Sequence, residues 1–322
     1  MDFTTARARF RGALLGVAVG DALGAPFEGW AEVPPGRLAQ LGERPAVLRY
    51  TDDTHMTLGV AQSLVASRGF DGAHMAAVFA RNFAAEPWRG YGAGPPEIFR
   101  LLGDGVPWDK ASTRLFGGRG SSGNGAAMRV APVALFACPR LPLAAWVARQ
   151  TALITHAHPL GVEGAVLQAC AITLLLQHPS DAPLDVPRFL GMIRAPLHGS
   201  HYLDKLDLVA HLVYSGDRGA GRALGNGVFA EEAVPAALHA FLRRPDSFAD
   251  VVTYAIGLGG DTDTIAAMAG ALAGAYLGED GIPLRWREKV EGADELRRLA
   301  DELLILATPG VRVRRRPDRA EP

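Results

Sequence analysis

The feature that most constrains the fold is a run of small residues from Ile265 to Leu277. Gly270, Gly274 and Gly278 recur at every fourth position, so one face of a helix here presents bare backbone to its neighbour. Because glycine lowers helix propensity, such a helix is stable only where other elements pack closely around it. The run therefore predicts a helix in the middle of the protein, with another element lying tightly against it.

The segment Gly259-Gly260-Asp261-Thr262-Asp263-Thr264 comes directly before this run. Its glycines predict a sharp turn. Thr262 or Asp263 is expected to cap the helix, because acidic groups are favoured at a helix N-terminus. A cap explains one carboxylate only. The second carboxylate, together with the hydroxyl groups beside it, indicates a site for a hard cation.

The composition favours a single all-α domain. No segment alternates strongly as a strand does, and the chain is long enough for a large core, so residues 1–308 are expected to form a compact orthogonal helical bundle. The formal net charge of −1 gives no global field for nucleic acid or membranes. Cys138 and Cys170 lie in apolar runs and are interpreted as buried thiols, which fits a cytoplasmic protein. A monomer is expected, with residues 309–322 as a basic, disordered tail.

The N-terminal segment has two interpretations. Arginines precede the apolar run 12–19, as in a secretory signal. However, Asp21 interrupts the apolar sequence early, and Thr4 or Thr5 is expected to cap a helix. The apolar positions of that helix fall on one face, namely Phe10, Leu14, Val17 and Ala18. An amphipathic core helix is the favoured interpretation. No uncharged apolar run reaches about eighteen residues, so no membrane-spanning helix is expected.

The remaining helices follow from apolar periodicity. They are expected at 56–65, 72–84, 160–176, 203–214, 231–243, 247–256 and 293–306. Residues 31–49 contain several prolines and are expected to be irregular, whereas 89–96 and 117–125 are glycine-rich loops. The second of these loops leads into the apolar run 126–137.

Two acidic pairs open two of the expected helices, and a fifth acid lies in a turn: Asp52 with Asp53, Asp261 with Asp263, and Glu28. For either pair alone, helix capping at the surface is the simpler explanation. Each pair, however, is flanked by threonines and leads into a helix too apolar for the surface, so we expect the pairs to converge. Carboxylates about 4 Å apart repel by roughly 4 kcal/mol at an effective dielectric constant of about 20, and the neighbouring sequence supplies no lysine or arginine. Oxygen ligands favour Mg²⁺ or Mn²⁺, and this much negative charge predicts two such ions.

The loop at 117–125 is neither a Walker A motif nor a dinucleotide fingerprint. A simple turn is the plainest interpretation. Ser121, Ser122 and Asn124 among its glycines also favour an anion cradle of backbone N–H groups before a helix. His156, as a lone histidine, is more often a capping or core residue than a catalyst.

Five motifs occur in an order that resembles the ADP-ribosylglycohydrolase family: Gly-Asp-Ala-Leu-Gly-Ala-Pro-Phe-Glu (20–28), Tyr-Thr-Asp-Asp-Thr-His-Met (50–56), Gly-Asn-Gly-Ala-Ala-Met-Arg (123–129), Thr-His (155–156) and Gly-Gly-Asp-Thr-Asp-Thr (259–264). The resemblance covers nearly the whole chain. Segments 89–94, 116–121, 224–228 and 265–276 look most like the branch that removes ADP-ribose from serine and degrades poly(ADP-ribose). The resemblance implies an all-α bundle with a two-metal site, in agreement with the expectations above.

The resemblance also implies a ligand set for two Mg²⁺ (or Mn²⁺) ions: Glu28, Thr51, Asp52, Asp53, Asp261, Asp263 and Thr264. Glu28 matches a glutamate that binds or releases the second metal as substrate enters. The catalytic residues are expected among Glu28, Asp52 and Asp53, with an aspartate orienting water and Glu28 transferring a proton.

The implied substrate contacts are Gly92, Gly94, Phe116, Arg119, Gly120, Ser121, Ser122, Gly123, Asn124, Gly125, His156 and Val228. Segment 119–125 and His156 match positions that hold the pyrophosphate and its ribose, and Phe116 and Val228 match positions that border adenosine. Ser122 departs from the pattern, because that branch usually has an aromatic residue there, beside the adenine. A weaker grip on adenine is implied, and poly(ADP-ribose) is less well supported as a substrate.

The implied activity is metal-assisted hydrolysis at C1 of the distal ribose, which releases ADP-ribose from serine side chains of modified proteins or from related O-linked compounds. ADP-ribose and ADP-ribosylated proteins are the expected partners, without direct binding of nucleic acid. Three alternatives stay open. They are an arginine-ADP-ribosyl hydrolase of the same family, a Mg-dependent all-α prenyl-diphosphate enzyme, and a non-catalytic relative that binds ADP-ribose. The aromatic content of 7% argues against the second, and the complete ligand set argues against the third.

Overall fold

The computed structural model describes residues 2–43, 46–179, 182–215 and 219–308, so the predicted basic tail at 309–322 lies outside the described residues. Within them the chain forms helices and no β-strand. The α-helices are α1 (Phe3–Gly24), α2 (Pro35–Leu38), α3 (Asp52–Ser67), α4 (Gly72–Ala85), α5 (Gly94–Gly103), α6 (Gly125–Met128), α7 (Ala131–Ala137), α8 (Leu141–Leu153), α9 (Pro159–Leu176), α10 (Val186–Arg194), α11 (Ser200–Ser215), α12 (Ala220–Leu224), α13 (Ala230–Arg243), α14 (Phe248–Gly257), α15 (Thr262–Leu277), α16 (Leu284–Arg287) and α17 (Ala293–Ala307). Four short 3₁₀ helices are η1 (Ala25–Phe27), η2 (Ser112–Arg114), η3 (Phe116–Gly118) and η4 (Glu279–Gly281). The all-α prediction is confirmed.

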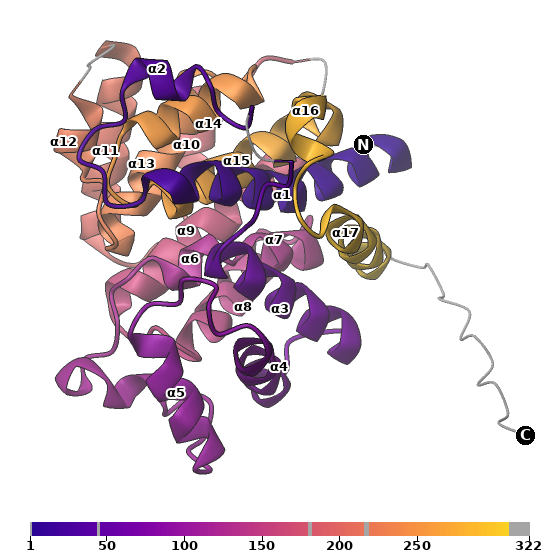
Figure 1. The fold of residues 1–322 in the computed structure, drawn as a ribbon, viewed down its shortest axis with the longest axis vertical. Coiled ribbons are helices and arrows are strands. Elements are labelled where there is room, and N and C mark those ends of the chain that lie inside the picture. Colours follow the sequence, from indigo (N-terminus) through magenta and orange to yellow (C-terminus); the bar gives the residue numbers. More distant parts are fainter. Residues whose placement is uncertain (1, 44–45, 180–181, 216–218, 309–322) are drawn as a thin grey trace, which may run out of the picture.

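Helices α1 and α15 form the centre of the bundle, with α13 and α14 above them and α3 and α4 below in Figure 1. The predicted glycine face of α15 meets a second glycine face on α1. A Cβ atom added to Gly16 would lie 2.1 Å from the carbonyl oxygen of Gly270, and one added to Gly274 would lie 1.9 Å from that of Gly12. Neither helix tolerates a side chain at these positions, because the two backbones are in direct contact.

Residues near the start of α1 contact residues near the end of α15, and residues near the end of α1 contact the start of α15. Gly12 meets Gly274, whereas Gly24, at the other end of α1, packs against the backbone of Thr262 and Asp263. The helices are therefore antiparallel. This arrangement places the C-terminal end of α1 beside the N-terminal end of α15, where the acidic segment 259–264 lies.

Burial of α1 differs from the expected amphipathic pattern. Every residue from Gly12 to Gly24 is buried, because other helices cover this half of α1 on all sides. Only the first turns have an exposed face. The cap also differs, since Asp2, and not Thr4 or Thr5, accepts the hydrogen bond from the backbone N–H of Thr5.

The cap predicted for α15 is also corrected. Asp261 occupies the N-cap position, and no side chain there bonds a backbone N–H in the usual capping pattern. The Asp263 carboxylate instead accepts a hydrogen bond from the adjacent N–H of Thr264 at 2.9 Å. The acids at the start of α15 therefore do not serve as ordinary helix caps, and their carboxylates can take part in a binding site.

The helices predicted from periodicity are present, with bounds extended by a few residues. Helices α5, α8, α10, α12 and α16 are additional to those expected from the sequence. The apolar run 126–137 forms two short helices, α6 and α7, because the backbone departs from helical geometry at Arg129 between them. The described residues of segment 31–49 are irregular apart from the single turn of α2.

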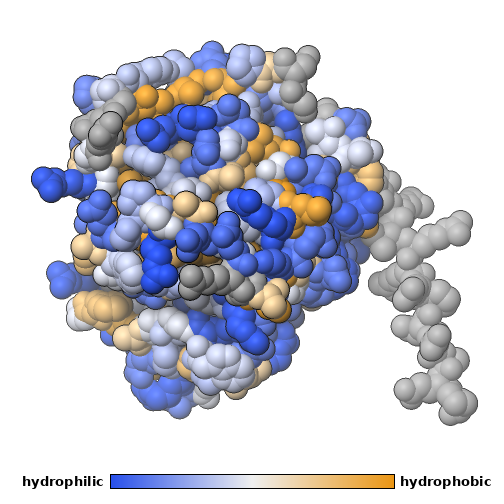
Figure 2. Space-filling model, turned by 45° about the horizontal axis from the view of Figure 1, so that its top comes forward, coloured by the Kyte–Doolittle hydropathy of each residue, from blue (hydrophilic) through white to orange (hydrophobic). Residues whose placement is uncertain are grey.

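Helix α9 is the one described helix long and apolar enough to cross a membrane, and 83% of it is buried inside the protein. Its neighbours are other helices of the bundle, as expected for a central core helix. Hydrophilic residues cover most of the face shown in Figure 2, with hydrophobic residues in patches between them.

Candidate active site

Asp21, in the last turn of α1, organises the site although the sequence did not single it out as a ligand. Its carboxylate accepts hydrogen bonds from the backbone N–H groups of Thr51 and Thr54, both at 3.0 Å, and from their hydroxyls at 2.8 and 2.6 Å. Asp21 thus caps α3 from a different helix. The sequence did contain a signal for this role, because Asp21 is an acid within an otherwise apolar helical run. A carboxylate in such a place is buried only if hydrogen-bond donors or cations satisfy it.

Asp53, at the start of α3, lies beside Asp21 with its carboxylate incompletely satisfied. One oxygen accepts hydrogen bonds from the hydroxyls of Thr51 at 3.3 Å and Thr264 at 3.2 Å. The other oxygen is buried and has no hydrogen-bond partner within the described residues. A buried carboxylate oxygen without a donor is costly, and a cation is the partner that would satisfy it.

The acids converge as predicted, in two overlapping groups. Asp21, Asp53 and Asp263 form one, and Glu28, Asp261 and Asp263 form the other. In each group, oxygens from all three residues lie within 4.8 Å of one another. Asp263 belongs to both. All members are buried except Glu28, which lies on the exposed turn after η1. Asp52 stands outside both groups.

Electrostatics favour a cation at this place. Within the described part of the chain, no lysine or arginine forms a salt bridge with any of these six carboxylates. Burial raises the pKa of Asp21 to about 7, that of Asp52 to about 8 and that of Asp263 to about 7. Nearby carboxylates contribute to each of these rises. The donors are oxygens without thiolate or imidazole, the set that hard divalent cations prefer.

Glu28 differs from the buried acids. The charge of Asp263 raises its pKa, and partial burial adds to the effect. Its turn is tied to the segment before α15, because Gly29 donates to the Gly260 carbonyl at 2.8 Å and Gly260 donates to the Trp30 carbonyl at 2.7 Å. These paired bonds set the position of the Glu28 backbone next to Asp261.

Five of the six acids, all except Asp21, line a cavity of about 320 Å³. Most predicted site residues line it: Glu28, Thr51, Asp52, Asp53, Gly92, Gly94, Phe116, Ser121, Gly123, Asn124, Gly125, His156, Val228, Asp261, Asp263 and Thr264. Met56, Met128, Arg129 and Thr155 also line the cavity, although they were not predicted to do so. Gly90 lies next to Asp52, and a Cβ atom added to it would be 3.7 Å from that carboxylate.

Three predicted substrate contacts do not line this cavity, namely Arg119, Gly120 and Ser122. The Arg119 side chain is exposed. Gly120, with φ of +71°, packs so closely on Ala157 that an added Cβ atom would lie 2.7 Å from that side chain. The Ser122 carbonyl accepts a hydrogen bond from Ala230, which turns this part of the loop toward α13.

The predicted anion cradle is partly engaged within the protein. The backbone N–H of Gly123 donates to the Ser121 hydroxyl at 3.1 Å, and that of Asn124 donates to the Val228 carbonyl at 2.9 Å. The Asn124 amide also donates to Asp261 at 2.5 Å. The loop is therefore fixed to the acidic site, while two of its backbone donors are already used.

His156 lines the cavity instead of serving as an isolated core residue. Its Nδ1 atom is 2.7 Å from the Thr155 hydroxyl, and its ring lies against Gly123 and Gly125. Burial lowers the pKa of His156 to about 3, with a smaller contribution from the positive charge of Arg129. The imidazole is therefore neutral at physiological pH and acts as a hydrogen-bonding group there.

A family model for ADP-ribosylglycohydrolase matches residues 3–311. The chain belongs to this family. ADP-ribosylhydrolase ARH3 of Homo sapiens is 37% identical, over 92% of this chain and 92% of its own. ADP-ribosyl-(dinitrogen reductase) glycohydrolase of Rhodospirillum rubrum is 30% identical, over 93% of this chain and 96% of its own. A solved structure described as an ADP-ribosylglycohydrolase-related protein complex superimposes with a TM-score of 0.71 at 31% identity, over 95% of this chain and all of that one.

As an ADP-ribosylglycohydrolase, the protein is a metal-dependent hydrolase that acts on ADP-ribosylated substrates. The acidic groups around Asp263 fit this requirement, because they bring together oxygen ligands that no basic side chain neutralises. The family resemblance and the all-α fold expected from the sequence are both confirmed.

Proposed function

We propose that this glycohydrolase cleaves the glycosidic bond at C1 of the distal ribose and releases ADP-ribose from modified protein side chains, serine before others. The observation that carries the proposal is the pair of acid groups that share Asp263, whose members other than Asp21 all line the cavity. The similarity to ADP-ribosylhydrolase ARH3 supports the same substrate class.

Two Mg²⁺ (or Mn²⁺) ions are proposed as cofactors. One would be held by Asp21, Asp53 and Asp263 and the other by Glu28, Asp261 and Asp263, with Thr51 and Thr264 supplying further oxygens. Such ions would orient the ribose hydroxyls and stabilise negative charge as the bond breaks. Two changes from the sequence prediction follow: Asp21 joins the ligand set, and Asp52, which was predicted as a ligand, lies in neither acid group.

Asp52 is the carboxylate proposed to orient the attacking water. It lines the cavity, and it lies in neither acid group, so its oxygens are not committed to those ligand sets. Glu28, on the exposed turn after η1, is proposed to transfer the proton. The carboxylate-rich surroundings would stabilise positive charge that develops on the ribose ring.

The remainder of the substrate is proposed to lie along the rest of the cavity. Gly123, Gly125 and His156 would contact the diphosphate and its ribose, and Gly92 and Gly94 form the facing loop. Phe116 and Val228 are 55% and 57% exposed, which suits two apolar surfaces that border adenosine. Ser122 does not line the cavity in this structure, so its small side chain does not imply weaker binding of adenine.

The alternatives are less well supported. A prenyl-diphosphate enzyme needs an aromatic-lined cavity, whereas Phe116 is the one Phe, Tyr or Trp among the described lining residues. A non-catalytic relative would be expected to lack ligands, yet every predicted ligand is present. Cleavage of arginine-linked ADP-ribose stays an alternative within the family. The monomeric state, cytoplasmic location and lack of direct nucleic-acid binding stay predictions from the sequence.

The test is a release assay on serine-linked, arginine-linked and polymeric ADP-ribose, with Mg²⁺, with Mn²⁺ and with chelator. We expect release from the serine linkage with metal and none in chelator. Asp301→Asn serves as a control, because Asp301 is partly exposed and is not among the residues that line the cavity. Full release in chelator would overturn the metal assignment, and release from arginine alone would overturn the linkage.

A further inference from the structure

Arg129, between α6 and α7, is a fully buried cation in the floor of the cavity. It is 1% exposed and belongs to the cavity lining together with Met128, Thr155 and His156. In the sequence it is the last residue of the motif at 123–129.

The partners of Arg129 are weak for a buried charge. One terminal nitrogen donates to the Thr151 carbonyl at 3.1 Å, and the other lies 3.6 Å from the sulfur of Met56. The guanidinium carbon is 4.9 Å from the centre of the Phe79 ring. Its Nε atom is buried with no hydrogen-bond partner in the described structure.

No carboxylate of the described residues lies within salt-bridge distance of Arg129. Arg89 shows the usual alternative. Its side chain is 8% exposed, and it pairs with both Glu86 and Glu291. Arg149, two residues before Thr151, pairs with Glu163. A buried charge without such a partner is costly, so its retention calls for a compensating interaction with something the cavity binds.

The charges around the cavity indicate what that partner is. Six ionised carboxylates and two divalent cations leave a site that is still negative, and a diphosphate adds more negative charge. Arg129 is the one arginine or lysine among the described lining residues, and the N–H groups of Gly123 and Asn124 are already engaged. A buried charge acts over several ångströms when water is excluded, so it need not touch the ligand.

We propose that the Arg129 guanidinium is the buried counter-charge for the diphosphate of the bound nucleotide, acting through the field it sets up in the cavity. This inference rests on the proposed function, which supplies a diphosphate ligand. Arg129 is then a positioning residue, because it stabilises the charge of the bound diphosphate and does not contact the reacting ribose.

The experiment compares Arg129→Met, Arg129→Gln and Arg129→Lys with the wild type in Mg²⁺. Binding of ADP-ribose, ADP and uncharged adenosine is measured by calorimetry, and thermal stability is measured alongside. We expect Arg129→Met and Arg129→Gln to weaken ADP-ribose and ADP about tenfold and adenosine less than about twofold. Arg129→Lys keeps the charge and should keep most of the affinity.

Stability provides the independent readout. Replacing a buried unpaired cation with methionine of similar shape should leave the melting temperature unchanged or raise it. The control Arg149→Met should lower the melting temperature, since it leaves Glu163 without its partner, and should not change affinity. If Arg129→Met does not fold, the Gln and Lys variants decide the question, because both shorten the side chain and only one keeps the charge.

Three results would contradict the proposal. Equal weakening of adenosine and ADP would mean that Arg129 only shapes the cavity. Unchanged affinity for ADP in the Gln variant would mean that its charge is irrelevant. Failure of the wild type to bind ADP-ribose at all would instead refute the proposed function, and the inference with it.

Discussion

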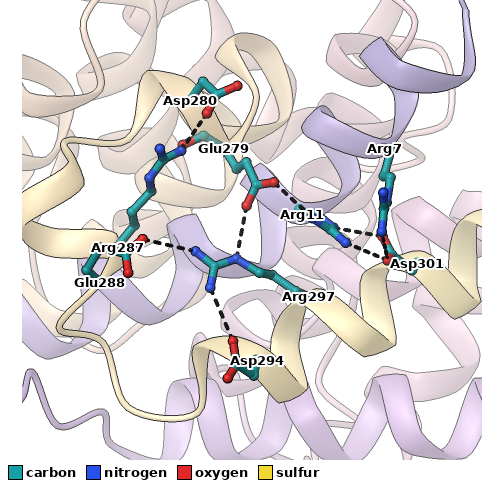
Figure 3. Close-up of polar contacts among 9 residues, drawn as sticks. All are labelled: Arg7, Arg11, Glu279, Asp280, Arg287, Glu288, Asp294, Arg297 and Asp301. Carbon is teal, nitrogen blue, oxygen red and sulfur yellow. Dashed lines mark hydrogen bonds and ion pairs between the residues drawn. The ribbon is translucent and has the colours of Figure 1, made fainter.

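The two ends of the α1–α15 helix pair carry opposite kinds of acidic cluster. At one end, Asp21 and Asp263 are buried among other carboxylates with no basic side chain in a salt bridge to them, within the described chain. At the other end, acids meet arginines in the ionic network of Figure 3. Its members are Arg7, Arg11, Glu279, Asp280, Arg287, Glu288, Asp294, Arg297 and Asp301.

The network fastens α17 and η4 to the first turns of α1. Asp301 accepts from Arg11 at 2.6 Å and from Arg7 at 2.8 Å, while Glu279 bridges Arg11 at 3.2 Å and Arg297 at 3.1 Å. Here side chains supply the neutralising charge, so the network needs no ligand. At one end of the helix pair, arginines neutralise the acids of the ionic network. At the other end, the acids around Asp263 have no basic side chain paired with them among the described residues and need added cations.

The pKa values of Asp301 and Asp263 differ in the way that this contrast predicts. Burial alone would raise the pKa of Asp301, but hydrogen bonds from Arg11 and Arg7 outweigh it and bring the pKa to about 2. Burial raises the pKa of Asp263 to about 7, and the neighbouring Asp261 adds to the rise. An acid whose pKa is pushed upward with no cation nearby marks the functional end of the pair.

The largest expected effect comes from changing the acid shared by both groups. Asp263→Asn should lower hydrolysis of ADP-ribosyl substrate at least ~100-fold, because both proposed cation positions lose a ligand. Asp301→Asn removes an acid of the same type at the opposite end and should keep hydrolysis within about twofold. Activity and Mg²⁺ binding are measured together. Retention of both properties in Asp263→Asn would break the proposed division between the two ends.

A second prediction concerns pH and the metal-free protein. In the folded protein the pKa values of Asp21 and Asp263 are raised to about 7 each, whereas the pKa of an aspartate in the unfolded chain is about 3.9. Between these values the folded state therefore binds protons that the unfolded state has released. Their contribution to stability is full below about pH 4 and is lost as pH rises through about 7. In chelator, the free energy of unfolding should therefore fall by at least ~2 kcal/mol between pH 5 and 8.

Mg²⁺ should reverse this trend, since it binds the ionised carboxylates. Asp301, whose pKa is lowered, has the opposite sign, and its contribution is lost only as pH falls from about 4 toward 2. Denaturant unfolding at each pH, with chelator or Mg²⁺, measures both. A chelator curve that rises toward pH 8 would contradict the assignment of unpaired, buried carboxylates.

Sequence alone predicted the convergence of the acidic segments, because Asp52, Asp53, Asp261 and Asp263 are polar positions at the starts of apolar helices. It also predicted the close approach on α15 from glycine spacing. It did not identify the second glycine face on α1, at Gly12 and Gly16, which is where α15 packs. One-dimensional spacing shows that a helix has a bare face and does not show which element covers it.

The role of Asp21 was not predicted for a related reason. Within the sequence it is one acid near a helix end, and its partners Thr51 and Thr54 are thirty or more residues away. The caps of α1 and α15 were wrong because several adjacent residues could have served. Arg119, Gly120 and Ser122 stay predictions as substrate contacts. That they do not line the cavity could not be read from the sequence, because the direction of the glycine loop depends on Ala157 and α13, which lie against it.

A smaller effect is expected in the ionic network. Glu279→Gln keeps the shape of the side chain but removes the charge shared by Arg11 and Arg297, so the free energy of unfolding should fall by about 1 kcal/mol. The loss should shrink in high salt, because these groups are partly exposed. Hydrolysis should not change. Denaturant titrations at low and high salt check this prediction, and a lost or halved activity would show that the two ends of the helix pair are coupled.

The smallest effect is expected at the edge of the same network. Asp294 is fully exposed at 103%, and its 3.4 Å contact with Arg297 joins residues three apart in α17. Solvent screens such a pair, and Asp294 also opens α17, where an acid is favoured by the helix dipole. Asp294→Asn should therefore leave the denaturant midpoint of unfolding almost unchanged. A loss as large as that of Glu279→Gln would mean that the network acts as one cooperative unit and that its stability does not follow the burial of each pair.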